Sequence, residues 1–163
     1  MKTKSRQILA MITVLALTLS IAVTSCKKDK DDDNSPSAQL SATAGANAFK
    51  PAYVYGVYSY GYISIGGVAK VGSDSATLSL TFRSDAEVNK ALDFDDVIIS
   101  YSTFPSQKSY SSLNYDAHGA FTASTIDKTN KKVSGTFSGV LYGSSSDSLV
   151  IKDGKFNTTY VSQ

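Results

Sequence analysis

Apolar and polar residues alternate one by one in several segments of this chain, and this period of two restricts its fold more than any other feature. Such alternation is typical of strands with one buried and one exposed face. The sets expected to face the core are Leu78, Leu80 and Phe82; Val97, Ile99 and Tyr101; Tyr115, Ala117, Phe121 and Ala123; and Val133, Phe137 and Leu141. The pattern therefore predicts an all-β domain.

The segment that carries this pattern, residues 38–163, has the length of a single domain. It is rich in Ser, Thr, Gly, Val and Tyr and has no Trp, which suits pleated strands separated by tight turns. We expect about eight or nine antiparallel strands in a β-sandwich or a partly closed barrel. The pattern alone does not separate these two architectures.

One interruption of the alternation indicates a helix. Ser84 and Glu87 have capping-box spacing, in which the first residue caps the helix and the second lies three residues on. The sequence therefore predicts one short helix from Ser84 to about Leu92.

A second local signal lies near the C-terminus. Asp153-Gly154 stands between two alternating runs, and Asp-Gly favours the two-residue type I′ turn. The sequence therefore predicts a hairpin that pairs Ile151 with Phe156.

Residues 1–25 have the three parts of a secretory signal. Lys2, Lys4 and Arg6 form a positive start, residues 8–23 form an apolar run, and small or β-branched residues follow. The apolar run has 16 residues, fewer than the roughly 20 that a membrane-spanning helix needs. We therefore expect a removable signal peptide.

Cys26 is the single cysteine of the chain and directly follows the signal. A disulfide framework needs cysteines in even number. Val23-Thr24-Ser25-Cys26 resembles the lipobox of bacterial lipoproteins, in which the signal is cut before the cysteine and the thiol and new amine are acylated. The resemblance implies that Cys26 is a lipid attachment site, and two or more acyl chains anchor a protein stably.

Residues 27–37 contain no apolar residue, so we expect them to form a disordered tether. A cysteine followed by a short Lys/Asp run resembles surface-exposed lipoproteins of the Bacteroidota, where an acidic stretch directs export to the cell surface. This resemblance implies an outer-membrane protein that faces the cell exterior, and a plain spacer is the alternative. The predicted organisation is a removed signal (1–25), a lipidated cysteine with its tether (26–37) and one β-domain (38–163).

Charge gives no reason to expect a nucleic-acid partner. Lys2, Lys4 and Arg6 leave with the signal, so the mature chain has 13 basic and 14 acidic residues. From Ala38 onward the count is ten of each. Nucleic-acid binding calls for a clustered basic face, and the sequence has no evident basic patch. The partner that the lipobox resemblance implies is the membrane, bound through acyl chains on Cys26.

The C-terminal part of the chain carries a further resemblance. Residues 133–139 read Val-Ser-Gly-Thr-Phe-Ser-Gly, and residues 153–156 read Asp-Gly-Lys-Phe. Over about residues 112–160 the chain resembles small Bacteroidota lipoproteins of an uncharacterised domain family, the DUF6252-like group. The resemblance implies an all-β fold and a lipidated envelope setting, and it implies no activity.

Groups that could carry catalysis or hold a metal are few. His118 is the single histidine, and Asp116 lies two residues before it on the polar face of one predicted strand. Hydrolysis by this pair also needs a positioned nucleophile, and the many serines nominate none. Zinc needs three or four ligands, and Asp93, Asp95 and Asp96 lack the spacing of a calcium loop. We therefore expect no catalytic site, no metal and no cofactor.

Tyrosines give the most specific hint of a binding surface, because five of the ten lie within residues 53–62. In one extended strand Tyr58, Tyr60 and Tyr62 share a face, while aliphatic neighbours occupy the other. If the aliphatic face is core, these tyrosines form an exposed strip that stacks on sugar rings or anchors a protein. A strand covered on both sides, or simple cross-strand pairing, is the alternative.

Together these expectations favour a non-enzymatic, lipid-anchored protein of the outer-membrane surface that binds a glycan or a protein or has a structural role. Two alternatives stay open. One is a small envelope hydrolase that uses His118 and Asp116 with a serine. The other is a lipocalin-like carrier of an apolar ligand, which requires an internal cavity.

Overall fold

The computed structural model of the chain describes residues 38–144 and 147–163, all within one compact unit, Ser35–Gln163. The secondary structure of these residues consists of strands joined by turns, with no helix. The strands are β1 (Gln39–Ala44), β2 (Asn47–Phe49), β3 (Val54–Ser59), β4 (Tyr62–Val71), β5 (Asp74–Arg83), β6 (Ala91–Leu92), β7 (Val97–Phe104), β8 (Ser109–Ser111), β9 (His118–Asp127), β10 (Lys132–Gly143), β11 (Ser148–Thr159) and β12 (Val161–Ser162). The predicted all-β class is confirmed.

All twelve strands belong to one open, mixed sheet, whose path runs β12-β3-β4-β5-β7-β8-β10-β11-β1-β2. β9 pairs with β10 and with the short β6. Every pairing is antiparallel except that of β12 with β3. The sheet folds over at β8, which pairs with β7 on one side and with β10 on the other.

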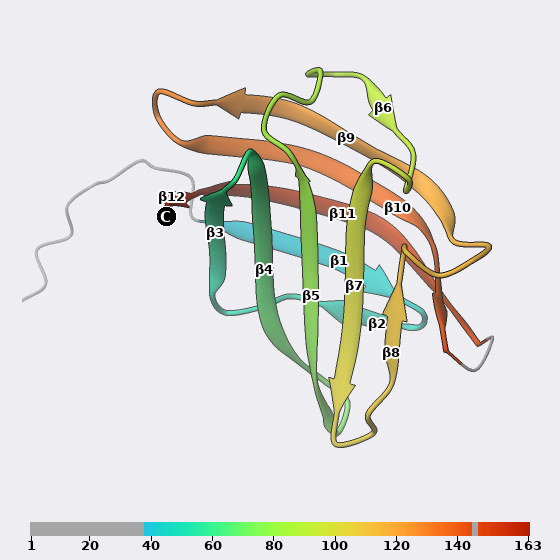
Figure 1. Cartoon of the computed structure of the whole chain (residues 1–163). Coiled ribbons are helices and arrows are strands. Elements are labelled where there is room, and N and C mark those ends of the chain that lie inside the picture. Colours follow the sequence, from blue (N-terminus) through green and yellow to red (C-terminus); the bar gives the residue numbers. More distant parts are fainter. Residues whose placement is uncertain (1–37, 145–146) are drawn as a thin grey trace, which may run out of the picture. The chain divides into compact units, whose positions relative to one another are not determined.

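The fold divides the long strands into two groups, which cross each other obliquely in Figure 1. We call β3, β4, β5 and β7 the tyrosine half, and β9, β10, β11 and β1 the bulge half. The sheet is not a closed barrel. Its halves face each other as the layers of a sandwich do, although they belong to one continuous sheet. The predicted eight or nine antiparallel strands are too few, because the sheet has twelve strands, eight of them with six or more residues, and one of its pairings is parallel.

Aromatic rings fill the space between the two halves. Phe82 of β5 lies with its ring centroid 4.7 Å from Phe121 of β9 and 5.9 Å from Phe156 of β11. Phe121 and Phe156 stack on each other at 5.4 Å. All three side chains are buried, so one hydrophobic core is shared by both halves.

The predicted inward sets are confirmed for three of the four segments. The buried residues are Leu78, Leu80 and Phe82 on β5; Val97, Ile99 and Tyr101 on β7; and Val133, Phe137 and Leu141 on β10. In the fourth segment Phe121 and Ala123 are buried, but Tyr115 is wrong, because it lies in a turn before β9 and is 92% exposed. That turn includes Asp116 at a φ of 73°.

The predicted helix from Ser84 to Leu92 is wrong. Asp85 pairs with Arg83 instead of supporting a first helical turn, and Asn89 has a φ of 62° that a helix does not allow. The amide of Asn89 donates to the carbonyl of Ala123, and the chain then joins the sheet as β6. A helix this short gains little by itself, so pairing with β9 decides the structure.

The predicted hairpin at Asp153-Gly154 is also wrong, because β11 runs through both residues without turning. Asp153 has a positive φ of 53°, as the Asp-Gly signal predicts, but Gly154 does not. A type I′ turn needs positive φ at both central residues. The result is a β-bulge, where the register of β11 shifts against both β10 and β1.

Candidate functional site

The tyrosine cluster forms a hairpin and not one strand. β3 ends at Ser59, β4 begins at Tyr62, and these two residues pair with each other. Tyr60 and Gly61 between them have φ values of 50° and 86°, which is the type I′ pattern. The expectation that Tyr58, Tyr60 and Tyr62 share one face of one strand is therefore wrong.

The hairpin distributes these three tyrosines over three environments. Tyr58 pairs with the core residue Ile63, is half-buried, and lies 6.2 Å from the Tyr160 ring. Tyr60 stands at the tip of the turn and is 98% exposed. Tyr62 is exposed on the outer face of the sheet, opposite Arg83 of β5. Tyr60 and Tyr62 are therefore available to a partner, whereas most of Tyr58 supports the core.

Tyr55 is one of the two clustered tyrosines that the strip hypothesis left out. It pairs with Gly66 of β4, and a Cβ atom at Gly66 would lie 2.3 Å from the Tyr55 hydroxyl oxygen and 2.5 Å from Cζ. The ring therefore lies across the sheet in the space that a side chain would occupy, with 39% of the residue exposed. The Gly66-Gly67 pair inside an apolar strand was the sequence signal for such a close approach.

Rows of hydroxyl groups continue from Tyr55 across the outer face of the tyrosine half. Gly66 is followed by Ser79 and Ser100 in register. In the next row the Ser64 and Thr81 hydroxyls are hydrogen bonded at 2.9 Å. Apolar side chains border these rows, namely Val68, Ile98 and Phe104, each at least 41% exposed.

Charge on this face lies at its ends. Among the described outward positions of β3, β4, β5 and β7, Lys70 and Arg83 are the charged residues. Arg83 donates two hydrogen bonds to the Asp85 carboxylate, at 2.9 and 2.8 Å, and this contact lowers the pKa of Asp85. The centre of the face is therefore an uncharged surface of hydroxyl groups with one fixed aromatic ring.

The Asp116–His118 pair does not form the arrangement that hydrolysis requires. His118 Nδ1 lies 2.7 Å from the backbone carbonyl oxygen of Asp116, and not from its carboxylate. Because a carbonyl only accepts, Nδ1 is the donor. Within the described part of the chain, no serine hydroxyl is hydrogen bonded to His118. The hydrolase alternative gains no support from this geometry, and the absence of enzymatic activity stays a prediction.

The packing between the two halves bears on the carrier hypothesis, and the placement of the acidic side chains bears on the metal hypothesis. Phe82, Phe121 and Phe156 occupy the space between the halves, and a hollow of about 250 Å³ opens at one edge, beside Tyr101 and Tyr110. Tyr110 donates a hydrogen bond to the Asp147 carboxylate there. Residues 38–144 and 147–163 contain no group of three or more His, Cys, Asp or Glu side chains placed to hold a metal.

Comparison with known proteins gives no family assignment: the chain matches no protein-family model, no curated protein and no solved structure. The resemblance to small Bacteroidota lipoproteins stays a prediction. Cys26, the signal and the tether lie outside the described residues. No helix within the described ranges is long and apolar enough to cross a membrane.

Proposed function

We propose that this chain is a lipid-anchored protein of the outer-membrane surface, whose β-domain is a non-enzymatic module that binds a neutral glycan. The anchor is Cys26, after a signal that ends at residue 25 and before a tether that ends at residue 37. The binding surface is the outer face of the tyrosine half.

The observation that carries the glycan assignment is the Tyr55 ring fixed across Gly66 beside rows of hydroxyl groups. A sugar ring presents polarised C–H groups, which the electron-rich face of a tyrosine attracts, and hydroxyls, which serine and threonine bind as donors or acceptors. A ring that is already held loses little conformational freedom on binding. The lack of charge at the centre of the face favours a neutral ligand over a charged one.

Tyr62 and Tyr60 extend this surface at the hairpin end. Tyr62 is 46% exposed on the same outer face as Tyr55, and Tyr60 projects from the adjoining turn. The predicted candidates Tyr60 and Tyr62 therefore stay in the proposed surface, while Tyr55 replaces Tyr58.

A binding assay with the chain from Ser35 onward tests the proposed ligand class, because this segment forms a compact unit with the whole core inside it. Immobilised neutral oligosaccharides are the probes. We expect Tyr55→Ala to weaken binding about tenfold, the effect of losing one aromatic contact of about 1.4 kcal/mol. Tyr115→Ala is the matched control, because Tyr115 is 92% exposed outside the proposed surface. Equal affinities of the two variants would contradict the assignment.

A separate experiment tests the anchor. Cells that express the full chain or Cys26→Ala are labelled with a fatty acid, and we expect label in the first protein alone. Label that persists in Cys26→Ala would contradict lipidation. Protease treatment of intact cells is expected to remove the domain from the surface, and a fully protected domain would contradict outward display.

A further inference from the structure

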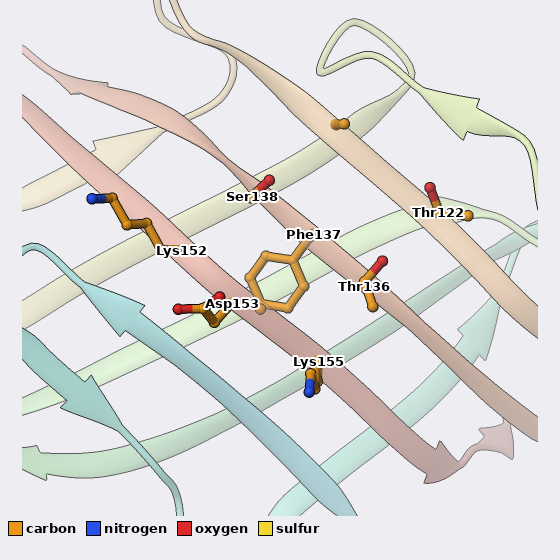
Figure 2. A pocket seen from close by; sticks show the side chains of 9 residues that line it. Thr122, Thr136, Phe137, Ser138, Lys152, Asp153 and Lys155 are labelled. Carbon is orange, nitrogen blue, oxygen red and sulfur yellow. The ribbon is translucent and has the colours of Figure 1, made fainter.

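The outer face of the bulge half contains a hollow of about 480 Å³, distinct from the surface on the tyrosine half. Its volume falls in the range of small-molecule sites, roughly 300–1,000 Å³. Figure 2 shows the side chains that line it, which come from β9, β10 and β11. The lining residues are Ala120, Thr122, Thr136, Phe137, Ser138, Lys152, Asp153, Gly154 and Lys155.

The bulge in β11 places two lysines on one side of this hollow. Lys152 and Lys155 are three positions apart, so in a regular strand they would point to opposite faces. Two residues separate Lys152 from Lys155 on β11, but a single residue separates their partners on β1, Thr43 and Ser41. This extra residue in β11, Asp153, shifts the alternation, and both lysines are exposed on the outer face, as Figure 2 shows.

Gly154 holds the bulge against the neighbouring strand. A Cβ atom at this position would lie 2.4 Å from the backbone oxygen of Phe137 and 2.7 Å from its ring. Phe137 is buried and pairs directly with Gly154. The lysines therefore extend from a backbone fixed by core packing, and not from a loop.

Hydroxyl groups lie beside both lysines in register. Lys155 pairs with Thr136 on β10 and with Ser41 on β1, and Thr136 pairs with Thr122. Cross-strand partners on one face have Cβ atoms about 4.5–5.5 Å apart, so these side chains can contact one ligand group. Ser138 adds a further hydroxyl to the lining.

The hollow has an excess of positive charge. Neither Lys152 nor Lys155 forms an ion pair or a hydrogen bond with another described residue. Asp153 is the one carboxylate among the lining residues, so the lining carries two ammonium groups and one negative charge. Ammonium and hydroxyl donors around a polar hollow fit the oxygens of an anionic group.

We infer that this hollow binds the carboxylate or sulfate group of an acidic saccharide, with Lys152 and Lys155 as charged donors and Thr136, Thr122 and Ser138 as hydroxyl contacts. The inference is independent of the neutral-glycan proposal, which concerns the other half of the sheet. Asp153 has two effects here: its positive φ creates the bulge, and its charge opposes the ligand.

Isothermal titration of the chain from Ser35 onward tests this inference with a sulfated monosaccharide, a uronic acid oligomer and their neutral counterparts. We expect the anionic probes to bind and the neutral ones to bind at least about tenfold more weakly. The double variant Lys152→Gln/Lys155→Gln should lose at least about tenfold in affinity for the anionic probes.

Two further variants distinguish binding at a specific site from nonspecific electrostatic attraction. Lys108→Gln/Lys128→Gln removes the same charge outside the hollow and should leave affinity unchanged. Asp153→Asn keeps a residue that tolerates positive φ and should bind the anionic probes several-fold more tightly. A control pair that weakens binding as much as the lysine pair, or an Asp153→Asn variant that binds no better, would overturn the inference.

Inorganic sulfate and anionic lipid vesicles are the remaining probes. Weaker binding of both than of the acidic saccharides supports the inference. Inorganic sulfate that binds as tightly as the sulfated sugar, or vesicle binding that disappears in Lys152→Gln/Lys155→Gln while saccharide binding does not, would overturn it.

Discussion

The tyrosine half and the bulge half have outer faces of different chemical character, although strands of both halves alternate with the same period. Serine and threonine hydroxyls are common to both faces. The tyrosine half adds a fixed ring and keeps its two charges at the ends, whereas the bulge half adds two lysines at a hollow. The halves share one core, so the difference arises on the outside, at single backbone irregularities.

Both irregularities consist of a non-glycine residue at positive φ followed by glycine. Tyr60-Gly61 has positive φ at both residues and reverses the chain, which separates Tyr58 from Tyr62. In Asp153-Gly154 the first residue alone has a positive φ. The resulting bulge shifts the alternation of side chains along β11, which brings Lys152 and Lys155 to the same face. The same kind of backbone irregularity thus separates the tyrosines at one position and brings the two lysines together at the other.

The largest expected effect concerns the core that joins the halves. Phe82→Ala removes the ring that contacts aromatic residues of the other half, and we expect a loss of about 3–5 kcal/mol in unfolding free energy. Urea unfolding followed by fluorescence and by circular dichroism should give one coincident transition in the wild type. Two separate transitions would show that the halves unfold independently and would contradict the single core that they share.

Two glycine substitutions compare how tightly each half is constrained. Gly154→Ala places Cβ against the Phe137 backbone, whereas Gly66→Ala would displace the Tyr55 ring from its place over Gly66, and its three nearest neighbours include no backbone atom. Within the roughly 1–3 kcal/mol typical of overpacking, we expect Gly154→Ala near the upper limit and Gly66→Ala near the lower one. Denaturant midpoints measure this order. Gly66→Ala should also weaken neutral-glycan binding, and the opposite order of stabilities would contradict the account of the bulge.

A smaller effect is expected at the hairpin tip. Tyr60 has a φ of 50°, a region that Asn adopts more readily than a bulky residue, and its side chain is almost fully exposed. Tyr60→Asn should therefore raise the unfolding free energy by up to about 1 kcal/mol. If the variant gains stability and loses glycan affinity, Tyr60 belongs to the binding surface. A loss of stability would contradict the turn geometry.

The smallest effect concerns the turn between β9 and β10. The Asp127 carboxylate accepts hydrogen bonds from the Thr129 and Asn130 amides and the Asn130 side chain, and the bonds from Asn130 are the main reason that its pKa is lowered. A lowered folded pKa stabilises the protein above the ordinary value of 3.8, and this contribution is lost as pH falls through the folded pKa.

Asp127→Asn should therefore have a slightly lower melting temperature than the wild type at neutral pH, and the two should converge in acid. Melting curves across the acidic range measure this. Asp153→Asn is the control, because its carboxylate accepts no hydrogen bond from a described residue. A difference between Asp127→Asn and wild type that persists in strong acid would contradict the role of the charge.

Much of the fold could be predicted from the sequence, because period-two alternation on β5, β7 and the buried part of β10 reports burial directly. The positions of chain reversal could not. Asp-Gly is the stronger hairpin signal, yet the pairing of β11 with β10 and β1 on both sides keeps that strand extended. Tyr-Gly is a weak signal. The Tyr55 contact depends on the register of β3 with β4, and the lysine pair depends on the bulge in β11, so neither is visible in the sequence.

Amide NMR mapping of the chain from Ser35 onward tests most directly whether the two outer faces are separate binding surfaces. Titration with a neutral oligosaccharide should shift the amides around Tyr55, Ser64 and Ser79, and titration with a sulfated saccharide should shift those around Lys152 and Lys155. Each ligand should leave the other set unchanged. If both ligands shift the same amides, or neither shifts the set assigned to it, the account of two distinct faces is wrong.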